Sequence, residues 1–175
     1  MTLRILYHGL GMAGKTTNLE KLREIYSNYV LDRIHQQTSE GRTVYLDILS
    51  LKIKTKSGGK ELSVEVFTTP GQERFKILRK WIFGYVNGLV LVLDSTRSLE
   101  ENLRAYEEVK EYGLNGVPMV LQLNKRDIGK LSPEEVMVAF GNLPIVEAVA
   151  TAGMGVAETF RAVLKEALNA KATAG

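Results

Sequence analysis

An eight-residue stretch near the N-terminus, GLGMAGKT at residues 9–16, has the residue types and spacing of a phosphate-binding loop. An apolar run precedes it and a helix-like pattern follows, as that motif requires. Glycines let the backbone curl so that N–H groups point at phosphate oxygens, and the start of a helix adds a positive dipole end. Lys15 is expected to reach the β- and γ-phosphates, and the Thr16 hydroxyl to bind Mg²⁺. The stretch predicts a nucleoside triphosphate site without specifying the base.

The positions of this loop have separate expected roles. Gly11 has no side chain, which would leave room beside the γ-phosphate for in-line attack. Thr17 is expected to add a hydrogen bond toward the α-phosphate. The residues predicted at the phosphates are therefore Gly9, Gly11, Met12, Ala13, Gly14, Lys15, Thr16 and Thr17.

A second polar stretch, NKRD at residues 124–127, follows the apolar run VPMVLQL. The Asp127 carboxylate could accept two hydrogen bonds from guanine, at N1–H and the 2-amino group, whereas adenine offers no such pair of donors. The aliphatic stem of Lys125 could lie against the base plane, and Asn124 could tie this stretch to the phosphate loop. Together the two motifs predict a guanine-nucleotide site and argue against an ATPase or kinase.

The composition of the 175-residue chain is that of one globular domain over residues 1–175, with a small polar tail that we expect to fray. Acidic and basic residues are interspersed and the net charge is +3, so no basic arm for nucleic acid is visible. The absence of cysteine excludes disulfides, thiolate metal sites and prenylation, and no secretory signal is visible. We expect a monomeric, cytoplasmic protein with no membrane anchor of its own.

Strand-like and helix-like stretches alternate along the chain, which predicts an α/β sandwich with a mostly parallel sheet. Expected strands cover residues 3–7, 44–55, 60–67, 88–94, 117–124 and 144–150, with SGG at 57–59 turning the second into the third as an antiparallel hairpin. Expected helices cover residues 16–31, 98–112 and 155–169, and another begins at Ser132. The polar, unpatterned residues 32–43 are expected to form a loop.

The phosphate loop, TPGQ at residues 69–72 and NKRD occur in an order and spacing that resemble a small Ras-like GTPase over nearly the whole chain. The chain is similar to the bacterial MglA-type GTPases in having TPGQ in place of DTAGQ and in the segment GRTVYLDIL at residues 41–49. The resemblance implies a six-stranded, mostly parallel sheet with strand 2 antiparallel, strand order 2-3-1-4-5-6 and about five flanking helices. It also implies a molecular switch that binds GTP and GDP with Mg²⁺ and slowly hydrolyses GTP.

The resemblance further implies contacts and partners. The stretch ATAG at residues 150–153 is similar to the family's last base-contacting loop, which would place the Ala150 N–H near guanine O6 with Thr151 beside it. MglA-type proteins act in cell polarity and motility and are regulated by a roadblock-domain partner, MglB. A GTPase-activating partner of that kind is therefore expected here. The alternative is a GTP-dependent interaction module with negligible hydrolysis.

Hydrolysis needs an oriented water and neutralisation of charge on the transferring phosphoryl group. Gln72 is the predicted water-orienting residue, and the Gly71 N–H is expected to contact the γ-phosphate. Thr43, with Thr38 as the second choice, is the candidate for sensing the γ-phosphate and binding Mg²⁺. Arg42 could stabilise transition-state charge from within the chain, or it could be a solvated surface arginine.

The usual carboxylate beside the metal is missing, because Thr68 stands where the family's common wording has aspartate. Three explanations remain open: Asp47 on the second strand approaches the metal, Asp94 at the end of GLVLVLD does so, or Thr16, phosphates and water suffice. The first or the third is favoured, and both predict weaker retention of Mg²⁺ with GDP. The predicted metal ligands are thus Thr16, Thr43 and Asp47, and the predicted catalytic residues are Gln72, Arg42 and Lys15.

Beyond Gln72, the stretch ERFKILRKWIFGYV at residues 73–86 crowds large apolar side chains too densely for one helix face to bury. Part of it is expected to form a partner surface whose order depends on the nucleotide. The alternative is that all of it packs in the core.

Overall fold

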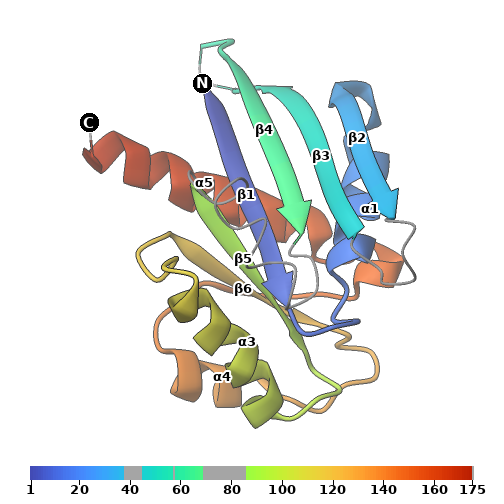
Figure 1. Ribbon diagram of the computed structural model, residues 1–175, viewed down its shortest axis with the longest axis vertical. Coiled ribbons are helices and arrows are strands. Elements are labelled where there is room, and N and C mark those ends of the chain that lie inside the picture. Colours follow the sequence, from blue (N-terminus) through green and yellow to red (C-terminus); the bar gives the residue numbers. More distant parts are fainter. Residues whose placement is uncertain (38–44, 57, 69–85, 175) are drawn as a thin grey trace.

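Seven strands form one mixed sheet in the computed structural model, which describes residues 1–37, 45–56, 58–68 and 86–174 (Figure 1). The strands are β1 (Thr2–Gly9), β2 (Val30–Gln37), β3 (Tyr45–Lys54), β4 (Glu61–Thr68), β5 (Gly88–Asp94), β6 (Met119–Asn124) and β7 (Ile145–Glu147). The described helices are α1 (Lys15–Ile25), α3 (Leu99–Glu111), α4 (Pro133–Phe140) and α5 (Val156–Ala174), with short 3-10 turns at Ser27–Tyr29 and Ala150–Ala152. Helices α1 and α5 cover one face of the sheet, and α3 and α4 cover the other.

The strand order is β2-β3-β4-β1-β5-β6-β7, in which β3 runs antiparallel to both of its neighbours and the remaining pairs are parallel. Without β2 this is the predicted order with its second strand antiparallel, so the expected fold class is confirmed. Strands β1, β4, β5 and β6 point the same way and end at one edge of the sheet (Figure 1). The segments that leave this edge carry the predicted phosphate and base motifs, as is usual for open α/β sheets.

The prediction was wrong for the segment after the first helix, and this accounts for the seventh strand. Helix α1 ends at Ile25 rather than near residue 31, and residues 30–37, expected to be mostly loop, form the edge strand β2. Ser27 and Asn28 favour turns over helix interiors because their side chains compete for backbone hydrogen bonds. An edge strand pairs on one side only, so backbone pairing with β3 forms it without the apolar pattern of a central strand.

Two further boundaries differ from the prediction near the C-terminus. The last strand covers only Ile145–Glu147, because the chain then turns into the 3-10 turn at residues 150–152. Helix α5 extends to Ala174 and so includes most of the tail that was expected to lie outside it. The other predicted signals are confirmed: Ser98 and Glu101 form a capping box at α3, and Ser132 caps α4.

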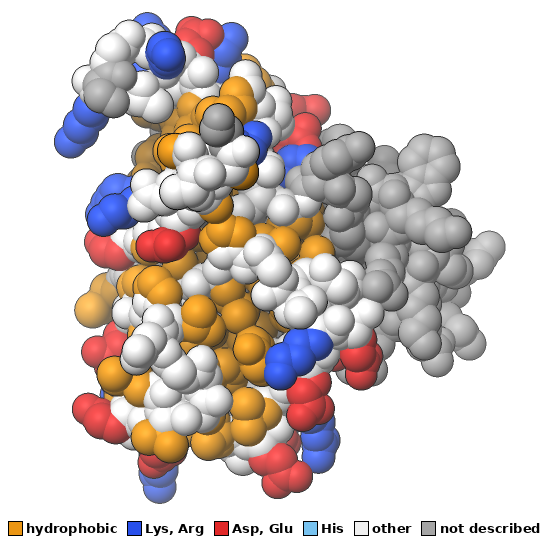
Figure 2. Space-filling view, turned by 90° about the vertical axis from the view of Figure 1, so that its left-hand side faces the viewer, with side chains coloured by type: hydrophobic (Ala, Val, Ile, Leu, Met, Phe, Trp, Pro, Cys, Tyr) orange, Lys and Arg blue, Asp and Glu red, His pale blue; other side chains and the backbone are white. Residues whose placement is uncertain are grey.

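Two apolar clusters hold the layers together. One joins the sheet to α1 and α5, and the other joins it to α3 and α4 around strands β5 and β6, which are almost wholly buried. Figure 2, which faces the left-hand side of Figure 1, shows hydrophobic side chains gathered in the lower half of that face with charged side chains around them. Among the helices that the structure describes, none is both long and apolar enough to cross a bilayer.

Candidate nucleotide-binding site

The phosphate loop joins β1 to α1 through a tight backbone turn. Met12 and Gly14 have positive φ angles of 64° and 112°, and the Ala13 N–H donates to the Leu10 carbonyl at 3.1 Å. Gly14 is the N-cap of α1 and provides no side-chain cap. The first N–H groups of α1 therefore remain available to an anion, and the helix dipole favours negative charge there.

Two glycines of the loop are required by close contacts. A Cβ on Gly14 would collide with the Asn124 side-chain nitrogen, and a Cβ on Gly9 would collide with the Val92 carbonyl oxygen. Around Gly11, by contrast, no atom lies within 4 Å of where a Cβ would stand. The fold thus has open space around Gly11, and its role beside the γ-phosphate stays a prediction.

Lys15 lies folded onto its own loop, with Nζ donating to the Gly9 carbonyl at 2.7 Å. Burial lowers the pKa of Lys15 to about 8, while attraction to the Glu108 carboxylate of α3 acts in the opposite direction. The ammonium therefore has an internal acceptor and a nearby negative group before any phosphate binds. An anion in the loop would compete for the same ammonium and favour its charged form.

Glu108 is a functional candidate that the sequence did not single out. Its carboxylate accepts a hydrogen bond from Tyr112 Oη at 2.9 Å and lies 3.9 Å from His8 Nε2. Burial, and then the charge of Lys15, lower the pKa of His8 to about 3, so this histidine is neutral near pH 7. Glu108, and not His8, is therefore the charged neighbour of the phosphate-loop lysine.

Asn124 connects three segments of the site. Its Nδ2 donates to the Ala13 carbonyl at 2.9 Å, and its Oδ1 accepts the Ala150 N–H at 2.9 Å. The predicted tie between the NKRD stretch and the phosphate loop is thus present, across 111 residues of sequence. The predicted contact of the Ala150 N–H with guanine O6 stays a prediction, and it would share or replace the bond to Asn124.

Lys125 is held in place by Asp94 at the end of β5. Lys125 has a positive φ of 62°, and its Nζ lies 2.8 Å from Asp94 Oδ2. Burial disfavours ionised Asp94, but the bonds from Lys125 and Thr96 outweigh it and lower the pKa of this carboxyl. Asp94 therefore acts on the base side of the site, and β1 stands between its strand and β4. This placement argues against the metal role that the sequence left open for Asp94.

The predicted base residues and part of the phosphate loop line one hollow of about 250 Å³. Eight of its ten lining residues were predicted from the sequence: Met12, Gly14, Thr17, Asn124, Lys125, Asp127, Ala150 and Thr151. The other two, Ile128 and Val149, are apolar neighbours of the motifs that no motif position identifies. An apolar lining with a few convergent polar groups is typical of a site for a planar base.

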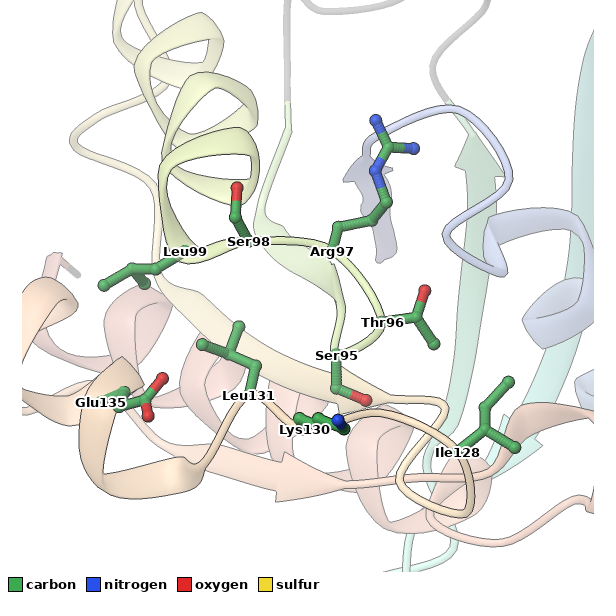
Figure 3. Close-up of a pocket in the computed structure, with 9 residues that line it drawn as sticks. All are labelled: Ser95, Thr96, Arg97, Ser98, Leu99, Ile128, Lys130, Leu131 and Glu135. Atoms are coloured by element: carbon green, nitrogen blue, oxygen red, sulfur yellow. The ribbon is translucent and has the colours of Figure 1, made fainter.

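A second hollow of about 440 Å³ lies beside the first, between the loop after β5 and the start of α4 (Figure 3). Ile128 borders both hollows, but none of the predicted site residues lines the second one. Its hydroxyls serve the fold, since Ser95 Oγ donates to the Asn124 carbonyl at 2.6 Å and Ser98 caps α3. The first hollow is therefore the candidate nucleotide site.

The metal side of the site is partly described. Asp47 and Thr68 are buried, on β3 and β4, and the strand register continues so as to place them opposite each other. Both share the sheet face of the cluster that packs on α1, which begins beside Thr16. Within the described ranges, no group of three or more His, Asp and Glu side chains could hold a metal by itself. One carboxylate and one hydroxyl fit Mg²⁺, which usually takes few protein ligands together with phosphate and water.

Several predicted residues lie outside the described residues. These are Thr38, Arg42, Thr43, Gly71 and Gln72, together with nearly all of the apolar stretch at residues 73–86. Their roles stay predictions.

Comparison with known proteins agrees with this geometry. The chain matches the model of the Ras family over residues 9–169. It belongs to the Ras family of small GTPases, so it is a guanine-nucleotide-binding switch of the class that hydrolyses GTP.

Individual relatives make this assignment more specific. The chain is 35% identical over 176 residues to the mutual gliding-motility protein MglA of Myxococcus xanthus, covering 93% of this chain and 88% of that protein. It is 28% identical over 173 residues to the Ras-related protein RabG2 of Dictyostelium discoideum, covering 93% and 81%. It is also 29% identical over 138 residues to an uncharacterized protein of Methanocaldococcus jannaschii, covering 77% of each chain. The predicted resemblance to MglA-type GTPases is confirmed.

Proposed function

We propose that this protein is a switch that hydrolyses GTP slowly until a partner accelerates the reaction. The observation that carries the proposal is the pair of hydrogen bonds made by the Asn124 side chain. They join the phosphate loop, the NKRD stretch and the Ala150 segment around one hollow. Such an arrangement suits a ligand with a base at one end and phosphates at the other.

Nucleotide recognition is divided between the two ends of the site. Lys15 and the N–H groups of the loop and first helical turn bind the β- and γ-phosphates, and Thr17 binds the α-phosphate. Asp127, which is exposed at the mouth of the hollow, accepts the two guanine donors. The Asp94 carboxylate holds Lys125 so that its stem lies against the base. Ala150 and Thr151 close the far side.

Thr16, Thr43 and Asp47 are the residues that would hold Mg²⁺. When bound, this ion would neutralise charge on the phosphate oxygens. The support for Asp47 is its complete burial at the same edge of the sheet as Thr16, on the face that packs on α1. Thr68 lies on the neighbouring strand, where the family's common wording has aspartate.

The hydrolysis step is assigned to segments next to β3 and β4. Gln72 orients the attacking water, and the Gly71 N–H holds the γ-phosphate. Arg42 stabilises the charge that develops in the transition state, from within the same chain. The order of the chain supports these assignments, since Arg42 precedes β3 and Gln72 follows β4, and both strands reach the edge that carries the nucleotide site.

A roadblock-domain protein of the MglB type is the proposed GTPase-activating partner. It would act on a cytoplasmic, monomeric chain in cell polarity or motility, with effectors at the segments around Arg42 and Gln72. The support is the similarity over 93% of the chain to a protein named for mutual gliding motility. A second candidate function, a GTP-dependent interaction module with negligible hydrolysis, is favoured by Thr68 at the usual aspartate position.

Nucleotide affinity and hydrolysis measured together test the proposal. We expect tight binding of GTP and GDP, at least 100-fold weaker binding of ATP, and slow hydrolysis that a roadblock-domain protein accelerates. Equal affinity for ATP would contradict guanine recognition. Tight GTP binding with no hydrolysis under either condition would favour the interaction module instead.

A further inference from the structure

Three hydrogen-bonded polar side chains lie inside the mostly apolar cluster between the sheet, α1 and α5. They are Asn18 on α1, Gln122 on β6 and Thr159 on α5, and each has no exposed surface. None belongs to a nucleotide-binding motif of the sequence. Because polar groups are costly to bury, their presence at the centre of the core calls for a physical reason.

The three side chains form one continuous hydrogen-bonded network. The side-chain amides of Asn18 and Gln122 form two reciprocal hydrogen bonds, each 2.8 Å long. The second hydrogen of the Gln122 amide goes to Thr159 Oγ1 at 2.9 Å. Together with the bonds at either end, these contacts use every amide donor of the pair, so the network carries no unsatisfied amide hydrogen.

The ends of the network reach two different loops of the site. The Asn18 amide also donates to the carbonyl of Gly14, the phosphate-loop residue that caps α1, at 2.8 Å. Thr159 Oγ1 donates to the carbonyl of Gly155 at 2.6 Å. Gly155 closes the segment from Ala148 that carries Ala150 and Thr151, here named the base loop. The network thus runs from the phosphate loop, through the buried strand β6, to the base loop.

Both loop ends are held at backbone conformations that favour glycine. Gly14 and Gly155 have φ angles of 112° and 78°. A Cβ at Gly155 would collide with the Glu147 carbonyl and with Ala148. The turn at Gly155 therefore packs closely against the C-terminal end of β7. The network therefore hydrogen-bonds to each loop at a residue whose backbone conformation is restricted.

Asn124 provides a first connection between the same two loops, from Ala13 to Ala150. The buried network provides a second, which passes through Gln122, two residues before Asn124 on β6. Two separate connections fix the relative position of two loops better than one, because a single bond leaves rotation about it free. Resting on the proposed nucleotide binding, we propose that Asn18, Gln122 and Thr159 are positioning residues that couple the phosphate and base ends of the site.

The coupling makes a distinctive prediction about ligands. A nucleotide that spans both loops benefits from their fixed separation, whereas a ligand that occupies one loop does not. Removing the network should therefore weaken the binding of GDP. The separate binding of guanosine and of pyrophosphate should stay largely unaffected. A role in general stability would not produce this pattern.

The first test replaces both amides at once, in the double variant Asn18→Val/Gln122→Met. This change leaves no orphaned amide in the core, and Gly14 still receives the Asn18 backbone N–H at 3.0 Å. We expect GDP affinity to fall about 10-fold, a typical size for coupling between sites, with a faster dissociation rate. Guanosine and pyrophosphate, measured by ligand-observed NMR, should bind within about twofold of the wild type. The thermal unfolding of the nucleotide-free protein should change little.

Two single substitutions at Thr159 provide a second test if the double variant folds poorly. Thr159→Val removes the hydroxyl while keeping the shape and leaves one Gln122 amide hydrogen without its acceptor, whereas Thr159→Ser keeps the hydroxyl. Thr159→Val should lower the GDP affinity about threefold or more, and Thr159→Ser should have wild-type GDP affinity. Val163→Ala, a cavity variant in the same cluster with no bond to either loop, is the control for lost stability alone.

Each outcome is decisive. Wild-type GDP affinity in the double variant, or equal weakening of GDP, guanosine and pyrophosphate, would overturn the coupling. So would a loss of GDP affinity in Val163→Ala as large as that in Thr159→Val. If the wild-type protein itself fails to bind GDP, the proposed function fails first, and the two failures are thereby distinguished.

Discussion

The two halves of the sheet make different contributions to the site. On the β1-β5-β6-β7 side, predicted recognition residues are tied together by polar bonds between distant segments, such as Asn124 to Ala13 and Lys125 to Asp94. On the β2-β3-β4 side, the proposed hydrolysis residues Arg42 and Gln72 precede β3 and follow β4 in the sequence, and the described groups are Asp47 and Thr68. The predicted recognition residues thus belong to the parallel core, while the proposed hydrolysis residues Arg42 and Gln72 belong to segments that adjoin its antiparallel flank in the sequence. Changes on one side should therefore leave the other function intact.

The largest expected effect breaks the hydrolysis side alone. Arg42→Ala should lower partner-stimulated hydrolysis by about 10³-fold, because a positioned arginine stabilises the transition-state charge by that order. Single-turnover hydrolysis with and without the roadblock-domain partner measures this change. GDP affinity should stay within about twofold of the wild type, since the contacts of the parallel half are untouched. Unchanged hydrolysis under both conditions would show that Arg42 is a surface residue.

The converse variant breaks the recognition side. Asp127→Ala removes two charge-assisted hydrogen bonds and should lower GDP affinity by about 100-fold. Isothermal titration with GDP and IDP measures it, because IDP lacks the 2-amino group and should lose less. Bound GTP, forced by saturation, should still be hydrolysed at nearly the wild-type rate. Equal losses for GDP and IDP would place the base contact elsewhere.

A third experiment sharpens the boundary between the halves at the metal. Asp47→Asn should raise the Mg²⁺ concentration needed to retain GDP by about 10-fold, a typical effect for losing a group that supports a metal. GDP release followed against free Mg²⁺ measures it. Adding Thr68→Asp to this variant should recover the loss, since the two side chains share one face of neighbouring strands. Tight retention of Mg²⁺ with GDP in Asp47→Asn alone would exclude Asp47.

The smallest expected effect concerns the support of Lys125. Asp94→Asn removes the carboxylate that holds the lysine and should weaken GDP binding by about threefold, the scale of a single ion pair with one partly exposed partner. The variant also has a pH signature. Because the folded protein lowers the pKa of Asp94, its stabilising contribution is present above the usual aspartate pKa and is lost as pH falls through the lowered value.

The difference in unfolding free energy between wild type and Asp94→Asn should therefore be largest near neutral pH and shrink below about pH 4. Urea unfolding at several pH values measures it. A difference that grows toward acid would reverse the assigned sign. Conversely, an unchanged GDP affinity would separate the ion pair from recognition.

The sequence predicts the recognition half well because its residues are set by chemistry that recurs at fixed spacing. Lys15 and Asn124 are each one position in a motif whose strand context is visible as an apolar run. It predicts the flank less well, because the edge strand β2 carries polar residues whose pairing is decided by a neighbour rather than by a pattern. Single polar letters within apolar stretches, such as Asn18 and Gln122, show their meaning only when α1 and β6 are packed together.

The reciprocal hydrogen bonds between the Asn18 and Gln122 amides also constrain how the sequence of this protein can evolve. A substitution at either position alone leaves the other amide buried without its partner, which is strongly unfavourable. Replacing both together restores a satisfied core, but the two codons lie 104 positions apart in the chain. Any lineage that exchanges this pair must therefore pass through an impaired intermediate or acquire both changes together. We expect the two positions to vary jointly or not at all among descendants of this sequence.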